Sequence, residues 1–364
     1  MSSTLTWEKV TTLDLGLDAR FFNDALGVTF DWYNRTTSDI LTTANLPATL
    51  GADAPYENMG TIQTKGWELA IDYRHTFKNG LHFGVTASVA DDKTEVTKWT
   101  YNTKIPSYGA TGWWDKSAYK EGMVLGDIWG LQFDRFLTED DFNADGSLKA
   151  GLPDQTKVFP AGYQFAPGDV LYKDLDNNGE IVKQTNTNDK GDLSVIGNAL
   201  PRLQFGLNLD AAWKGFDISM FFQGVAKRKL WAAGNQVLPG FTTGEPFYKG
   251  AEDYWTPENT DAFYPRPMDY KQSASGNYSV NDRYLLNMAY LRLKTFTVGY
   301  SLPKVWLSKF KVQGLRVYFT GENLFTIDGV KPAIDPEIGI RTASGKSDQR
   351  NFGRSYPYQK TVSF

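Results

Sequence analysis

Long stretches of the sequence alternate apolar and polar residues, and this period of two constrains the fold more than any other feature. In residues 11–20, for example, Leu13, Leu15 and Leu17 are separated by polar or small residues. Successive side chains of a β-strand point to opposite faces, so each such stretch is predicted to be a strand with one apolar face. The same pattern recurs at residues 26–33, 67–74, 81–89, 203–213, 216–222, 289–302, 312–325 and 358–364.

The connections between these stretches are alternately short and long. Short turns are predicted near residues 22–25, 77–80, 213–216 and 302–312, and long loops at about 37–59, 95–200, 231–287 and 327–356. Membrane β-barrels have short turns on one side and long extracellular loops on the other. The stretches hold about 10 to 15 residues, and a tilted strand needs about 9–11 to cross the hydrocarbon layer. We therefore expect an all-β fold, an antiparallel transmembrane β-barrel segment of about nine or ten strands that occupies the whole chain, 1–364.

Aromatic residues make up 15% of the chain, and many stand at the ends of the alternating stretches. In a membrane barrel they would form girdles at the lipid–water interfaces, whereas in a soluble sandwich they would close the core. The loop asymmetry favours the barrel. The residues concerned are Phe21, Phe22, Tyr33, Phe77, Trp213, Phe216, Tyr300, Trp306 and Phe310.

Composition excludes several classes of function. The net charge of −4 gives no electrostatic basis for nucleic-acid binding, and the absence of cysteine excludes disulfides, thiolate–metal sites and a cysteine nucleophile. No apolar run is long enough for a transmembrane helix. The first residues also lack a signal peptide, so for an outer-membrane protein we expect the true N-terminus to lie upstream.

Several stretches resemble the SusC-like branch (RagA/SusC type) of TonB-dependent outer-membrane transporters. They follow the order of that family along nearly the whole chain: residues 5–41, 60–90, 167–181, 196–224, 290–307, 315–327 and 356–364. The resemblance implies a barrel of about 22 strands, of which this chain would be the C-terminal part. It also implies a Gram-negative, Bacteroidetes-like outer membrane as the location.

The resemblance further implies the partners of such a transporter. These would be a SusD-like surface lipoprotein that acts as a lid, the energy-coupling protein TonB, outer-membrane lipid, and an oligosaccharide or peptide as cargo. The family's plug domain and its TonB-contacting segment have no counterpart in the chain. The resemblance therefore implies a nutrient-uptake transporter, and without those parts the barrel fragment is expected to be inactive alone.

Residues 174–185 resemble the first half of a calcium-binding EF-hand loop. Asp174, Asp176 and Asn178 supply side-chain oxygens at positions 1, 3 and 5, and Glu180 supplies a backbone carbonyl at position 7. Position 12 is Thr185 rather than glutamate, so tight Ca²⁺ or Mg²⁺ binding requires Asp189 or Asp192 to fold back. A metal-free turn rich in Asp and Asn is an equally good interpretation.

Tryptophans in the predicted loops are candidates for stacking on sugar rings, although each could instead pack one loop against another. These are Trp113, Trp114, Trp129, Trp231 and Trp255. The two histidines, His75 and His82, flank one turn, where two exposed turn residues are a better interpretation than a metal pair. No catalytic motif is found, so we expect no enzyme.

Two alternatives to the transporter fragment are a self-contained small porin and a soluble carbohydrate-binding β-protein. An odd number of strands argues against the porin, because bacterial single-chain barrels have even numbers. An open sheet would also leave on the order of five unpaired polar groups per edge in lipid, at several kcal/mol each. The chain is therefore expected to need further strands to close a barrel.

Overall fold

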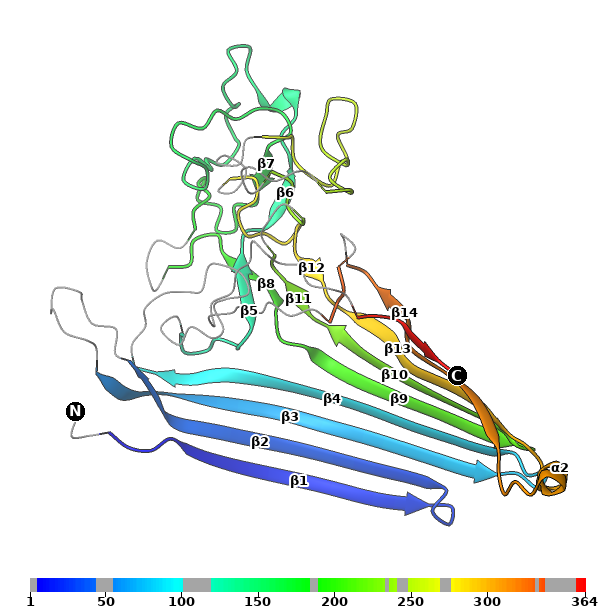
Figure 1. Ribbon diagram of the computed structural model, residues 1–364. Coiled ribbons are helices and arrows are strands. Elements are labelled where there is room, and N and C mark those ends of the chain that lie inside the picture. Colours follow the sequence, from blue (N-terminus) through cyan, green and yellow to red (C-terminus); the bar gives the residue numbers. More distant parts are fainter. Residues whose placement is uncertain are drawn as a thin grey trace.

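The computed structural model describes residues 5–43, 55–100, 119–183, 189–232, 236–240, 248–268, 276–330, 334–337 and 358–364. Nine strands of this part form one antiparallel sheet, in which each strand pairs with the sheet strands before and after it along the chain (Figure 1). Among the described residues, β1 and β15 pair on one side only, so the sheet is open. The strands are β1 (Lys9–Phe21), β2 (Leu26–Thr43), β3 (Tyr56–Thr76), β4 (His82–Trp99), β9 (Arg202–Trp213), β10 (Phe216–Lys227), β13 (Tyr290–Ser301), β14 (Arg316–Asp328) and β15 (Thr361–Ser363). The predicted all-β barrel segment is confirmed.

The register of the sheet sorts its side chains into an apolar and a polar face. One row across five strands is entirely apolar: Leu17, Phe30, Leu69, Val89 and Phe205. The adjacent row, one residue along each strand, is small or polar: Asp18, Thr29, Ala70, Ser88 and Gly206. The apolar row is not covered by protein on β1, where Leu17 is 60% exposed. The other members of the row are exposed or partly exposed, and none is buried. An apolar row of this kind is the arrangement that a lipid-facing barrel wall requires.

Short turns join the strands at one end of the sheet, as the sequence predicts. Lys214 and Gly215 connect β9 to β10 with φ angles of 47° and 88°, which is the two-residue hairpin that matches the twist of its strands. The connection from β13 to β14 contains the short helix α2 (Lys304–Leu307) and a 3₁₀ turn, η5 (Ser308–Phe310). No helix in the described part of the chain is long and apolar enough to cross a membrane.

Glycines on the polar face let charged side chains meet across an intervening strand. Arg20 on β1 and Asp72 on β3 form an ion pair of 2.8 Å over Gly27 on β2. A Cβ atom on Gly27 would lie 2.3 Å from both side chains. Arg316 and Asp217 make the same kind of bridge over Gly299. The polar face is thus cross-linked laterally by charges as well as by backbone hydrogen bonds.

The long connections pack into a body at the end of the sheet opposite α2 (Figure 1). Short strand pairs stabilise it: β5 (Asp127–Gly130) with β8 (Ser194–Asn198), β6 (Phe133–Phe136) with β7 (Val170–Tyr172), and β11 (Lys229–Leu230) with β12 (Leu286–Asn287). The spanning strands also reach farther than expected, because β2 continues to Thr43 and β3 begins at Tyr56, within the predicted loop 37–59.

Two apolar cores hold this loop body together. We call the first the Leu238 core; it consists of Ile128, Ala199, Leu230, Trp231, Ala232, Val237, Leu238, Tyr264, Tyr278, Tyr284, Leu286, Met288, Val330 and Ile334. The second, the Tyr172 core, consists of Leu131, Phe136, Val158, Phe159, Val170, Tyr172, Ile181, Leu193, Trp255 and Ala262. The Leu238 core contains residues from three of the long connections, so these loops pack together as one unit rather than folding separately.

Candidate functional site

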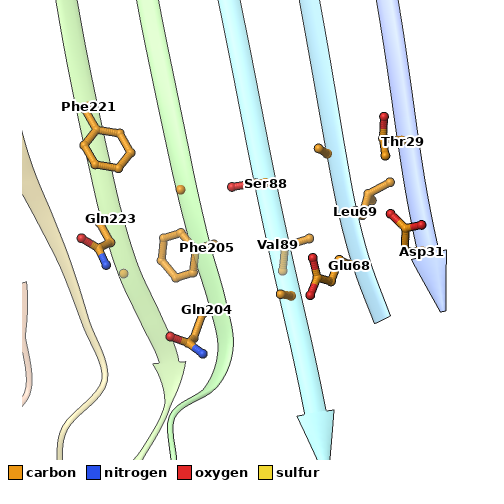
Figure 2. Close-up of a pocket in the computed structure, with 14 residues that line it drawn as sticks. Thr29, Asp31, Glu68, Leu69, Ser88, Val89, Gln204, Phe205, Phe221 and Gln223 are labelled. Carbon is orange, nitrogen blue, oxygen red and sulfur yellow. The ribbon is translucent and has the colours of Figure 1, made fainter. Parts of the chain in front are cut away.

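The polar face of the sheet contains a hollow of about 510 Å³ (Figure 2). Its floor is formed by the small residues Ala70, Ser88 and Gly206, which lie side by side in one register row on β3, β4 and β9. Longer polar side chains surround this floor. Asp31 comes from β2, Glu68 from β3, Gln204 from β9 and Gln223 from β10.

Asp31 and Glu68 lie directly opposite each other on neighbouring strands. Like charges in this position destabilise a sheet. Within the part of the chain that the structure describes, no lysine or arginine forms an ion pair with either carboxylate. The hollow therefore combines the two carboxylates with apolar lining residues such as Phe221, on the face that a closed barrel would turn inward.

These wall residues were not identified as a site from the sequence. Their polarity was visible in the alternation, but the hollow depends on which rows align across the sheet. Strands β4 and β9 are neighbours in the sheet, although residues 100–201 separate them in the sequence. Nothing in the alternation fixes the register across such a long connection.

The structure brings together the carboxylates of the predicted cation loop. Oxygens of Asp174 and Asp176 lie with one from Asp192 within 4.8 Å of one another. Asn178 stays close, because its amide donates to Asp176 at 3.0 Å. The Glu180 side chain forms an ion pair with Lys157, which leaves its backbone carbonyl for the loop, the group that the sequence pattern assigns to this position.

Asp192 provides the third carboxylate of this cluster. It is one of the two residues that could take the place of the glutamate missing at position 12. Its carboxylate is buried and accepts hydrogen bonds from the N–H groups of Leu175 and Val182, both at 2.8 Å. The Oδ1 atom of Asp174 is inaccessible and has no hydrogen-bond partner, whereas its Oδ2 accepts from Gly179. Although desolvation acts to raise it, the pKa of Asp174 is lowered by backbone N–H donors, so the carboxylate is ionised at neutral pH.

The structure gives three of the predicted sugar-binding tryptophans a packing role. Trp231 lies in the Leu238 core at 3% exposure, Trp255 lies in the Tyr172 core at 7%, and Trp129 packs against the latter. Trp231 and Trp255 therefore fit the packing interpretation, because neighbouring side chains cover their rings. Trp113 and Trp114 lie outside the described residues.

The two histidines do not form a shared site. His75 is opposite Phe83 and His82 is opposite Thr76, so the two rings project from different faces of the sheet. The His75 ring lies parallel to that of Tyr73 and contacts Phe77 edge to face. His82 lies 3.5 Å from Asp210. The interpretation as unrelated residues at a turn is the correct one.

Comparison with known proteins agrees with this architecture. Residues 2–324 match the family described as TonB dependent receptor-like, beta-barrel. TonB-dependent receptor P3 of Formosa agariphila is 28% identical over 98% of this chain and 33% of its own length. TonB-dependent receptor SusC of Bacteroides thetaiotaomicron is 23% identical over 93% of this chain and 30% of its own length.

Solved structures show the same fold. The RagAB peptide transporter aligns with a TM-score of 0.65 and 21% identity, and the match covers 93% of this chain and 33% of that chain. The chain thus spans about a third of the length of the relatives it matches. The SusC-like resemblance is confirmed, and the family comprises outer-membrane receptors and transporters. The chain belongs to the TonB-dependent receptors, as part of their β-barrel domain.

Proposed function

We propose that the natural protein containing this chain imports oligosaccharides or peptides across the outer membrane of a Bacteroidetes-like bacterium. The observation that carries the proposal is the amphipathic sheet, whose apolar row from Leu17 to Phe205 backs directly onto the polar hollow. Such a wall separates lipid from a polar interior. TonB would supply the energy, and a SusD-like lipoprotein would cover the loop body from outside.

The open edges support the further proposal that residues 1–364 do not transport alone. Strand β1 has 13 residues, and among the described residues only β2 pairs with it. An edge of this length would leave roughly half of its backbone polar groups unpaired in lipid, at several kcal/mol each. Additional strands of the same protein would satisfy them.

The test is uptake of labelled oligosaccharides and peptides by cells that express the natural protein, with and without TonB. The proposal predicts uptake that requires TonB and is lost when the strands outside residues 1–364 are deleted. TonB-independent uptake by the 364-residue chain alone would instead establish the small-porin alternative. A monodisperse, sugar-binding chain in the absence of detergent would establish the soluble carbohydrate-binding alternative.

We also propose that Asp174, Asp176 and Asp192 bind Ca²⁺ or Mg²⁺ as a structural ion of the loop body. The specific support is the buried, unpartnered Oδ1 of Asp174, next to carboxylates from Asp176 and Asp192. Oxygen donors of this kind suit hard cations. Titration of the natural protein with CaCl₂ and MgCl₂ should show saturable binding and increased protease resistance. Both effects should be lost in the Asp174→Asn variant. Asp145→Asn, in another exposed turn, is the matched control. Identical titrations of wild type and Asp174→Asn would contradict the proposal.

A further inference from the structure

The loop body contains a second hollow, of about 710 Å³, that is lined mainly by tyrosine and proline. Four tyrosines converge on it: Tyr248, Tyr254 and Tyr264 from the segment 248–268, and Tyr278 from the segment that follows. Pro265 and Pro267 lie beside Tyr264 in the lining. The size is typical of ligand pockets, which are predominantly apolar with few polar groups.

The floor of this hollow is rigid. Tyr264 and Tyr278 are buried in the Leu238 core, and the Tyr264 hydroxyl donates to the carbonyl of Val237 at 2.9 Å. Tyr278 packs edge-on against Tyr284 with ring centroids 5.3 Å apart. Because these rings are already fixed, a ligand that contacts them orders little additional structure on binding.

Two backbone hydrogen bonds fix one wall relative to the floor. The N–H of Trp255 donates to the carbonyl of Tyr264 at 3.0 Å, and the N–H of Tyr264 donates to that of Asp253 at 2.9 Å. Tyr254 is held by this bridge, yet its side chain is 40% exposed. Tyr248 is 38% exposed. The hollow thus presents two accessible aromatic rings above a buried aromatic floor.

The chemistry of the lining favours an extended peptide over a sugar. Each sugar ring carries several hydroxyls, and burying them without partners costs free energy. Among the described lining residues, Lys249 and Glu252 are the only charged ones, and the Tyr264 hydroxyl is already engaged. Aromatic-lined grooves bind proline-rich segments, whose polyproline II conformation is preformed and keeps its backbone solvated.

We propose that this hollow binds an extended, proline-rich segment of a peptide cargo before import. The proposal rests on the proposed function, which places the loop body at the outer surface. It narrows the cargo to peptides with proline-rich segments. Tyr248 and Tyr254 would supply the accessible ring surfaces, and Lys249 and Glu252 would contact charges that flank the proline-rich segment.

The test is fluorescence anisotropy of a labelled decaproline peptide with the detergent-solubilised natural protein. A labelled glycine–serine peptide of equal length and unlabelled maltohexaose as competitor are the ligand controls. Tyr254→Ala should weaken decaproline binding about ten- to thirtyfold, as truncation of an aromatic anchor does. Tyr254→Phe, which keeps the ring, should bind within about twofold of wild type. Tyr56→Ala is the matched control, because Tyr56 is exposed and lies outside the hollow.

Saturable decaproline binding that depends on Tyr254 and resists maltohexaose supports the inference. Displacement by maltohexaose, equal binding of the glycine–serine peptide, or equal loss in Tyr254→Ala and Tyr56→Ala would overturn it. Binding is measured without TonB, so it is separate from transport. Tyr254-dependent binding without TonB-dependent uptake of any cargo would refute the transport proposal while supporting the hollow as a peptide site.

Discussion

An arginine at position 71 should destabilise the membrane-inserted protein far more than an arginine at position 70. Ile71 and Ala70 are neighbours on β3, but Ile71 lies in an apolar register row with Val28 and Ala87, whereas Ala70 lies in the floor of the polar hollow. Ile71 is five residues before Thr76, the turn end of β3. Since about 9–11 residues cross the hydrocarbon layer, Ile71 is expected near its middle.

The size of the difference follows from this depth. Arginine on the lipid face near the midplane costs about 2–4 kcal/mol. At position 70 the guanidinium would enter a hollow that already contains Asp31 and Glu68, so we expect a change within about 1 kcal/mol. From the middle of each range, the two variants should differ by about 3 kcal/mol, which is about a 150-fold difference in the folding equilibrium.

Reversible urea unfolding in phospholipid vesicles, followed by tryptophan fluorescence, measures this difference in the natural protein that contains the chain. Ile71→Leu is the control for loss of the native side chain and should change stability by less than about 1.5 kcal/mol. Equal destabilisation by the two arginines, or greater destabilisation at position 70, would refute the assignment of the faces.

Three further predictions concern the sheet and the loop body. Trp255→Ala should destabilise the loop body by about 3–5 kcal/mol, because it leaves a cavity in the Tyr172 core. Limited proteolysis of the loops should then be faster. Unchanged protection from the protease would contradict the packing role of Trp255. The hydrogen bonds from Arg135 lower the pKa of Asp141 to about 2. The pair therefore contributes roughly 2 kcal/mol to the free energy of unfolding, which is complete above about pH 4 and is lost as the pH falls toward 2. Asp141→Asn should remove this part of an acid-unfolding curve, and a curve identical to that of the wild type would exclude the contribution. Gly27→Val should separate Arg20 from Asp72 and slow barrel assembly, measured by heat-dependent mobility on gels, whereas unaffected assembly would show that the bridge over β2 is dispensable.

The repeating part of the fold could be predicted from the sequence, because the period of two is a local property. The strands, the hairpin at Lys214 and Gly215, and the side of the sheet that bears the long loops all follow from it. The interior of the loop body could not be predicted. Its cores join residues as distant as Ile128 and Ile334, and no short-range periodicity records such contacts.

The candidate sites show the same limit. The ligand spacing identified Asp174 and Asp176, but only the folded loop shows that Asp192 supplies the third carboxylate and that Glu180 turns to Lys157. Tyr33 was expected in an interfacial girdle, yet its ring lies over Gly66 on the polar face. An aromatic residue at the end of a strand therefore indicates an interfacial girdle only when the face of the sheet on which it lies is also known.

The central claim is that one face of this sheet contacts lipid and the other lines a polar interior. The chain has no cysteine, so single cysteines can be introduced along β3 from Glu68 to Tyr73 and spin-labelled one at a time. Accessibility to oxygen, which dissolves in lipid, should be high at 69, 71 and 73, and accessibility to a water-soluble nickel complex should be high at 68, 70 and 72. Two such profiles out of phase with a period of two would confirm the claim. Nickel accessibility at every position, or no alternation at all, would contradict it.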